Sequence, residues 1–213
     1  MGVVEREAIR YLGYGNHPVE ERTKELVREC ILEGERALRP RHLVREFPLI
    51  IGKEMTVDCG CFLTESRKLA GNLSGCSQVL LMAATLGLAA DRQLHRLQTV
   101  SAAKAVVMQA VQAAMLEDYC NKLCRQWKEL YEKKGLYLRP RFSPGYGDFP
   151  LSVQKQLLSG LEAEKRLGIT LTDGYLMVPT KSVTAVIGLG RQPAGCVPEG
   201  CEACEKRNCK FRR

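Results

Sequence analysis

The chain of 213 residues has no apolar run long enough to cross a bilayer. Its longest run, VLLMAATLGLAA at residues 79–90, is shorter than the ~20 residues that a membrane-spanning helix needs. The first ten residues, MGVVEREAIR, carry charges where a secretion signal has an apolar segment. We therefore expect a cytoplasmic protein with no membrane partner.

Motifs for nucleic-acid binding are also absent, although the net charge is +8, from 32 basic and 24 acidic residues. The basic residues are spread thinly except in KRNCKFRR at the end of the chain. No helix–turn–helix glycine turn, aromatic ribonucleoprotein motif or zinc finger accompanies them. The charge fits an acidic protein at least as well as a nucleic acid, and we predict no nucleic-acid partner.

Apolar residues make up 45% and charged residues 26% of the chain, as in ordinary soluble domains. The length suffices for one domain with a substantial core, or for a domain with a small appendage. Ten cysteines suggest disulfides only in a short secreted chain, which this is not. We expect six of them to be reduced core residues: Cys30, Cys59, Cys61, Cys76, Cys120 and Cys124.

The other four cysteines cluster near the end, at Cys196, Cys201, Cys204 and Cys209. Four thiolates spaced C-x4-C-x2-C-x4-C suit a tetrahedral zinc ion or an iron–sulfur cluster. Free thiols, or disulfides formed after purification, are the alternative. We divide the chain into a domain at residues 1–192 and a cysteine-rich tail at residues 193–213.

Hydrophobic periodicity predicts helices at residues 3–12, 19–38, 66–76, 101–134 and 151–167. It predicts strands at residues 42–52, 54–62, 77–87 and 181–189, and a hairpin at 169–178 that turns at Asp173–Gly174. The first two strands are expected to pair with each other. Strands in blocks, with helices grouped between them, indicate an α+β fold with a mixed or antiparallel sheet flanked by helices.

The helix at 101–134 is expected to be buried over its first half. Residues 105–116, AVVMQAVQAAML, carry no charge and are apolar or small nearly all round. In the second half, the apolar residues lie on one face of the helix only. A long, partly buried helix therefore lies at the centre of the predicted fold.

The segment RPRFSPGYGDFP at residues 139–150 favours neither helix nor strand. Pro140 and Pro144 fix φ at two points, so this loop holds its shape at little further entropic cost. Gly145 and Gly147 leave peptide groups open to close approach. A stiff loop of this kind is either a plain connector or a shallow binding site.

The side chains of this loop favour a particular ligand chemistry. Arg141 offers a planar fork of donors for a carboxylate or a phosphate. Tyr146 offers a ring face and a hydroxyl. Asp148 can accept from a hydroxyl or cap the helix that follows. Together they suit a small molecule with a carboxylate and a flat ring, whereas a connector would pair Arg141 with a surface acid.

Two motifs together carry a family resemblance. RPRFSPGYGDFPL, followed by GITLTDGYLMVPTKSVTAVIG, resembles the activation domain of cobalamin-dependent methionine synthase. That family has an Arg–x–x–Pro–Gly–Tyr loop that binds S-adenosylmethionine, and then an LT…Met–x–Pro…SV segment. IRYLGY and LMAATLG also look like the stand-alone versions of this domain, so the resemblance covers nearly all of residues 5–190.

The resemblance implies a binding site for S-adenosylmethionine. Arg141 would bind its carboxylate, Ser143, Pro144 and Gly145 would contact it through backbone groups, and Tyr146 would line the site. Glu117 either approaches the sulfonium or amino group or is an ordinary solvated helix residue. The chain reads IGLGRQPAGC where the family continues with an aromatic segment that closes over the ligand, so no contact is carried over from there.

The resemblance also implies a role in reactivation. The domain would present S-adenosylmethionine to oxidised cobalamin on a methionine synthase that lacks its own activation domain, with a flavodoxin- or ferredoxin-like protein donating one electron. The motif contains no general base or nucleophile, so the chain would be an activation component without a complete catalytic site. His17, His42 and His95 lack the Asp–x–His–x–x–Gly context of corrinoid carriers, so cobalamin must come on the partner.

An alternative function depends on the cysteine tail. In that case the protein is a redox or metal-binding protein that activates a different corrinoid methyltransferase through its terminal cysteines. A basic nucleic-acid-binding module is a third and weaker hypothesis.

Overall fold

A computed structural model describes residues 1–15 and 17–193 of the chain. These residues form seven α-helices: α1 (Val3–Tyr11), α2 (Glu21–Ala37), α3 (Arg67–Asn72), α4 (Leu88–Val100), α5 (Ala102–Glu132), α6 (Gln154–Gly160) and α7 (Ala163–Leu167). Two short 3-10 segments are η1 (Lys53–Met55) and η2 (Leu151–Val153). No helix in this part of the chain has both the length and the apolar character needed to cross a bilayer.

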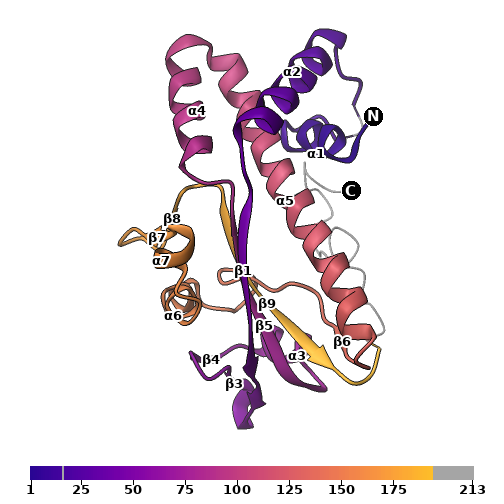
Figure 1. Cartoon of the computed structure of the whole chain (residues 1–213), viewed down its shortest axis with the longest axis vertical. Coiled ribbons are helices and arrows are strands. Elements are labelled where there is room, and N and C mark those ends of the chain that lie inside the picture. The colour runs from indigo at the N-terminus through magenta and orange to yellow at the C-terminus, as the bar shows by residue number, and fades with distance from the viewer. Residues whose placement is uncertain (16, 194–213) are drawn as a thin grey trace.

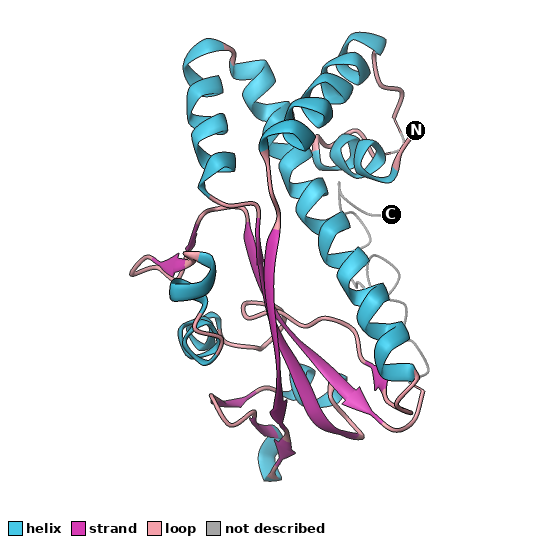
Figure 2. Ribbon diagram, in the orientation of Figure 1, coloured by secondary structure: helices cyan, strands magenta, loops and turns pink. Residues whose placement is uncertain are grey.

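The described residues also form nine strands: β1 (Arg41–Pro48), β2 (Ile50–Ile51), β3 (Thr56–Asp58), β4 (Leu63–Glu65), β5 (Cys76–Thr85), β6 (Tyr137–Leu138), β7 (Thr170–Leu171), β8 (Met177–Val178) and β9 (Ser182–Gly190). The main sheet is antiparallel throughout, in the order β1-β5-β9-β6. β2, β3 and β4 form a small second sheet, and β7 pairs with β8. The α+β prediction with an antiparallel sheet is confirmed (Figure 2).

The two central strands are buried on both faces. β5 is a nearly continuous apolar run, which is the pattern of a strand covered on both sides. In β9, residues 184–190 are all buried. Ala185, Ile187 and Leu189 face the cluster beneath α5, whereas Val186 faces the cluster on the opposite side.

Helix α5 covers one face of the sheet with its C-terminal half and extends beyond the sheet with its N-terminal half (Figure 1). There α1, α2 and α4 pack around it in a separate helical cluster. The prediction of a buried helix over residues 105–116 is confirmed for most of that stretch. Val106 and Gln109 are exposed, and Ala113 and Met115 are only partly buried.

The opposite face of the sheet is covered by α3, α6, α7 and the small sheet (Figure 2). The single helix predicted at 151–167 is interrupted here, because Glu162 adopts a left-handed conformation with φ 55° between α6 and α7. The strand predicted at 42–52 also divides in two. β1 pairs with β5. Only the short β2 pairs with β3, although the whole strand had been expected to do so.

Candidate functional site

The loop at 139–150 begins as an extension of the main sheet. The backbone N–H of Arg139 donates to the carbonyl of Gly188 at 2.8 Å. Phe142 and Val186 exchange two backbone hydrogen bonds, at 2.9 and 2.8 Å. The first part of the loop therefore has a fixed register against the edge of β9.

The loop then turns sharply around two glycines. The N–H of Tyr146 donates to the carbonyl of Ser143 at 3.1 Å, and the N–H of Gly145 donates to that of Phe149 at 2.8 Å. Gly145 has φ 87°, and a Cβ there would lie 3.3 Å from a methyl carbon of Leu151. Only glycine enters this region of φ without strain, so the turn depends on it.

Two aromatic side chains anchor the turn in the core. Phe149 is 1% exposed, and its ring centroid lies 5.9 Å from that of Phe62 and 6.2 Å from that of Phe142. Tyr146 packs edge-on against Phe142 but is itself 73% exposed. The loop thus presents the phenol of Tyr146 outward from a rigid base.

Asp148 fixes the far end of the turn. Its carboxylate accepts from the Ser66 hydroxyl at 2.5 Å and from the N–H groups of Arg67 at 2.9 Å and Lys68 at 3.2 Å. The hydrogen bond from Ser66 is the main reason why the pKa of this carboxyl is lowered. Asp148 therefore caps α3, which precedes it by about 80 residues. Of the two roles expected from the sequence, acceptance from a hydroxyl is seen, whereas the helix that follows receives no side-chain cap.

Arg141 crosses from the loop to α5. Its guanidinium donates to Asn121 Oδ1 at 2.7 Å and to Glu117 Oε2 at 3.1 Å. The arginine side chain is 19% exposed and that of Glu117 is 42% exposed. Burial is the largest single influence and opposes the charge of Arg141, but the carboxylate of Glu117 together with the nearby Cys120 and Cys124 outweighs it, so the net pKa of Arg141 is raised.

The sequence predicted Arg141 and Glu117 separately and missed Asn121. Glu117 and Asn121 are four residues apart, so they lie one turn apart on one face of α5. This spacing of four residues could have predicted from the sequence that Asn121 lies beside Glu117. Glu117 is the ion-pair partner of Arg141 and is partly exposed, so the pairing with a surface acid that was expected of a plain connector is present. Contact of either residue with a ligand stays a prediction.

No activated nucleophile lies beside this ion pair in the described part of the chain. Cys120 is on the same face of α5 and fully buried. Burial raises the pKa of its thiol to about 12, although the charge of Arg141 acts in the opposite direction. The thiol stays protonated near neutral pH, so the arrangement can bind and orient a ligand but cannot attack it.

The remaining candidate residues are accounted for as follows. Arg139, the first arginine of the loop, donates to the carbonyls of Ser74 and Gln192, both at 3.2 Å, and ties the end of β9 to the loop before β5. The six cysteines expected in the core are free thiols, and half of them are fully buried. Cys196, Cys201, Cys204 and Cys209 lie outside the described residues, which contain no cluster of side chains suited to a metal ion.

Comparison with known proteins gives matches that include this region. Residues 89–194, from α4 to the end of β9, match the family described as "Vitamin B12 dependent methionine synthase, activation domain". The whole fold is similar to a solved structure, "Crystal Structure of the MetH Reactivation Domain bound to AdoHcy", at a TM-score of 0.62 and 17% identity, over 88% of this chain and 76% of that one. No curated protein sequence matches the chain.

Proposed function

Because the chain belongs, through residues 89–194, to the family of vitamin B12-dependent methionine synthase activation domains, we propose that it binds S-adenosylmethionine at the loop 139–150. The methyl group would be presented to oxidised cobalamin on a methionine synthase that lacks its own activation domain. The observation that carries this proposal is the family match over residues 89–194, which includes the rigid turn that points Tyr146 outward.

The structural neighbour supports the choice of ligand. It is a reactivation domain bound to AdoHcy, which is S-adenosylmethionine without its methyl group. At 17% identity the likeness itself concerns the fold. The ligand is inferred for this chain from the family match together with the chemistry of the loop.

The ion pair of Arg141 and Glu117 is complementary to the amino-acid end of S-adenosylmethionine. That end carries a carboxylate and an ammonium group. The carboxylate would pair with Arg141, and the ammonium or the sulfonium with Glu117, so that each residue exchanges its internal partner for one on the ligand. Neither the mostly buried charge of Arg141 nor the partly exposed charge of Glu117 is left unpaired in the bound or the free protein, and this keeps the cost of the exchange low.

The rest of the loop would hold the nucleoside. The Ser143 carbonyl and the Gly145 N–H already form hydrogen bonds within the turn, so the ligand would contact the other peptide groups of Ser143, Pro144 and Gly145. The conformation of the turn is already fixed, so little entropy is lost on binding. Tyr146, largely exposed, provides a ring face for adenine. A ligand held on such an open turn remains accessible to a second protein.

The role of the chain in the reaction is positioning, which replaces a random encounter with an oriented one. The cobalamin of the partner supplies the nucleophile after one electron from a flavodoxin- or ferredoxin-like donor, and S-adenosylhomocysteine remains in the loop. Methyl transfer from a sulfonium releases a neutral thioether and needs no proton, so the high pKa of the nearby Cys120 is no obstacle. We place this reaction in the cytoplasm.

Calorimetric titration with S-adenosylmethionine tests the proposal. The wild-type chain should bind saturably, and Arg141→Ala should bind about tenfold more weakly or worse, about 1.4 kcal/mol, because a charge-assisted pair is lost. Lys122→Ala is the matched control, since Lys122 lies on α5 and is 61% exposed. Lack of binding by the wild type would overturn the proposal.

A second candidate function is favoured by the spacing of the terminal cysteines. We propose that residues 193–213 form a unit separate from the domain at 1–192, and that Cys196, Cys201, Cys204 and Cys209 bind zinc or an iron–sulfur cluster. A redox-active cluster there would favour activation of a different corrinoid methyltransferase. A zinc ion, which has no redox chemistry, would favour a purely structural tail.

A further inference from the structure

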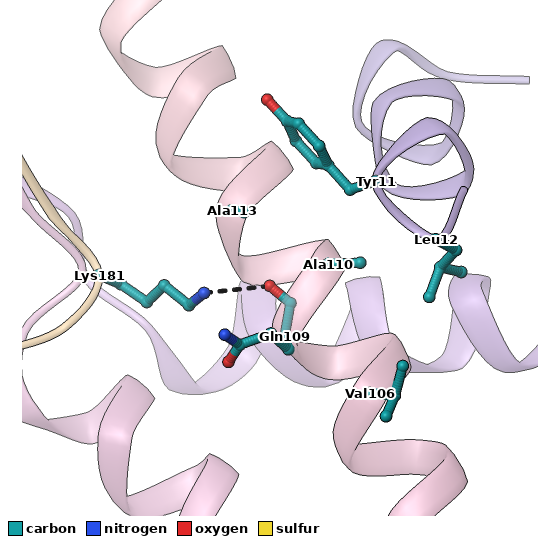
Figure 3. Close-up of a pocket in the computed structure, with 7 residues that line it drawn as sticks. All are labelled: Tyr11, Leu12, Val106, Gln109, Ala110, Ala113 and Lys181. Atoms are coloured by element: carbon teal, nitrogen blue, oxygen red, sulfur yellow. Dashed lines mark hydrogen bonds between the residues drawn. The ribbon is translucent and has the colours of Figure 1, made fainter. Parts of the chain in front are cut away.

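A groove lies on the N-terminal half of α5, away from the loop 139–150 (Figure 3). Its volume is about 520 Å³, within the usual range for small-molecule sites. Tyr11 and Leu12 line it from the end of α1, Val106 and Ala113 from α5, and Lys181 from the segment between β8 and β9. Three different segments of the chain therefore meet around one hollow.

Lys181 is the charged residue of this groove, and its charge is poorly compensated. Its Nζ donates to the backbone carbonyl of Gln109 at 3.2 Å. No carboxylate of residues 1–15 or 17–193 lies within ion-pair distance of it. An ammonium has three N–H donors, and the described structure provides an acceptor for one of them.

Asp91 is the acid whose charge acts on Lys181, but its carboxylate already forms hydrogen bonds with Thr180. The carboxylate of Asp91 accepts from the backbone N–H of Thr180, at 3.1 Å for one oxygen, and from the Thr180 hydroxyl. Burial lowers the pKa of the Lys181 amine, and the charge of Asp91 only partly opposes this. A half-buried cation thus faces an open hollow without a partner of opposite charge.

The walls of the groove are mainly apolar. Val106 is 62% exposed, although its neighbours Ala105 and Val107 on α5 are buried. Ala110 and Ala113 continue the same wall toward the C-terminal half of the helix. An apolar stripe left open beside a lone ammonium is complementary to a molecule with an anionic end and an apolar body.

A second hollow continues the first across the helix. It has a volume of about 350 Å³ and shares Val106 and Gln109 with the first hollow. Its other walls are Leu94 and Gln98 of α4 and two alanines at the start of α5. The combined groove is elongated and could accommodate several methylene groups in a row.

We propose that this groove binds a small amphipathic carboxylate, whose anionic end pairs with Lys181 and whose aliphatic body lies against Val106, Ala110 and Ala113. One ammonium balances one negative charge, so a carboxylate fits better than a phosphate dianion. The site is separate from the proposed S-adenosylmethionine site. Gln109 and Glu117 are eight residues apart on α5, which corresponds to roughly 12 Å along the helix axis.

The experiment titrates the full chain with octanoate and, separately, with octanamide, its uncharged analogue, by calorimetry. Wild type should bind octanoate saturably and bind octanamide about tenfold more weakly or worse. Lys181→Met should lose this preference, whereas Lys128→Met, at a 63% exposed position of α5, should keep it. S-adenosylmethionine binding should be unchanged in both variants, so failure here is distinct from failure of the proposed function.

A measurement on the wild type alone keeps the test valid if Lys181→Met does not fold. Octanoate should shift the NMR signals of Val106, Ala110 and Ala113, and leave those of Tyr146 in place. The proposal is overturned if wild type shows no saturable binding of octanoate, if the shifts occur elsewhere, or if a folded Lys181→Met variant still prefers octanoate to octanamide.

Discussion

At the scale of single residues, some residues of the loop 139–150 anchor it to the rest of the protein, and others present their side chains at the proposed binding site. Phe142, Phe149 and Asp148 hold the turn to the core and to α3. Arg141 reaches α5, and Tyr146 faces outward. Anchors and presenting residues alternate along the chain, so the presenting side chains start from backbone that packing and hydrogen bonds have already fixed.

Asp148→Asn should lower stability by roughly 1 kcal/mol near neutral pH, since it weakens three hydrogen bonds at the start of α3. The pKa of Asp148 is lowered in the folded protein, so its contribution is complete above the unfolded value of ~3.9 and is lost as the pH falls through the folded value. The difference between wild type and variant should therefore shrink under acid conditions.

Thermal unfolding of both proteins between neutral pH and about pH 3 measures this difference. Asp173→Asn, in the turn between β7 and β8, is the control and should follow the wild type throughout. A gap between Asp148→Asn and wild type that stays constant down to the lowest pH would contradict the account.

The sequence predicted the character of this loop but not its contacts. Proline and glycine at alternating positions are enough to predict a stiff turn, because their effect on φ is local. The pairing of Arg141 with Glu117 and Asn121 depends on how α5 crosses the sheet, and a single sequence does not contain that angle. For the same reason Asp148 was assigned to the helix next to it and not to α3.

At the scale of elements, α5 is the helix that connects the sheet with the helical cluster. Its C-terminal half packs on the sheet, and its N-terminal half packs on three other helices. The long uncharged stretch predicted this burial correctly. The sequence missed α4, which follows Gly87 directly after β5 without a side-chain cap, so the usual signal for a helix start was lacking.

Two neighbouring alanines of α5 should respond differently to the same enlargement. Ala114 is 1% exposed inside the helical cluster, so Ala114→Leu should cost about 1–3 kcal/mol through overpacking. Ala113 lines the groove, so Ala113→Leu should leave stability nearly unchanged and should weaken octanoate binding. Urea denaturation compares the two variants. Equal losses of stability would show that the helix faces are not placed as described.

At the scale of the whole molecule, three apolar clusters hold the described fold together. The α+β class followed from strands grouped in blocks, and it is confirmed. The small sheet β2–β3–β4 and the division of residues 151–167 were harder to predict, because strands of two or three residues and a single left-handed residue leave little pattern in a sequence.

The proposed tail should be independent of that fold. Purified wild type should hold about one zinc ion or one iron–sulfur cluster per chain, measured by elemental analysis and absorbance after anaerobic preparation. Replacing Cys201 and Cys204 by serine should remove the metal. Affinity for S-adenosylmethionine and the thermal midpoint should not change. A metal-free wild type would contradict the proposal for the tail without affecting that for the loop.

The most direct test of the central claim is a crystal structure of the chain with S-adenosylhomocysteine or S-adenosylmethionine bound. The account predicts the ligand on the turn at 143–146, its carboxylate on Arg141, and the contact between Arg141 and Glu117 opened to admit it. A ligand bound elsewhere, with the 3.1 Å contact between Arg141 and Glu117 intact, would contradict it.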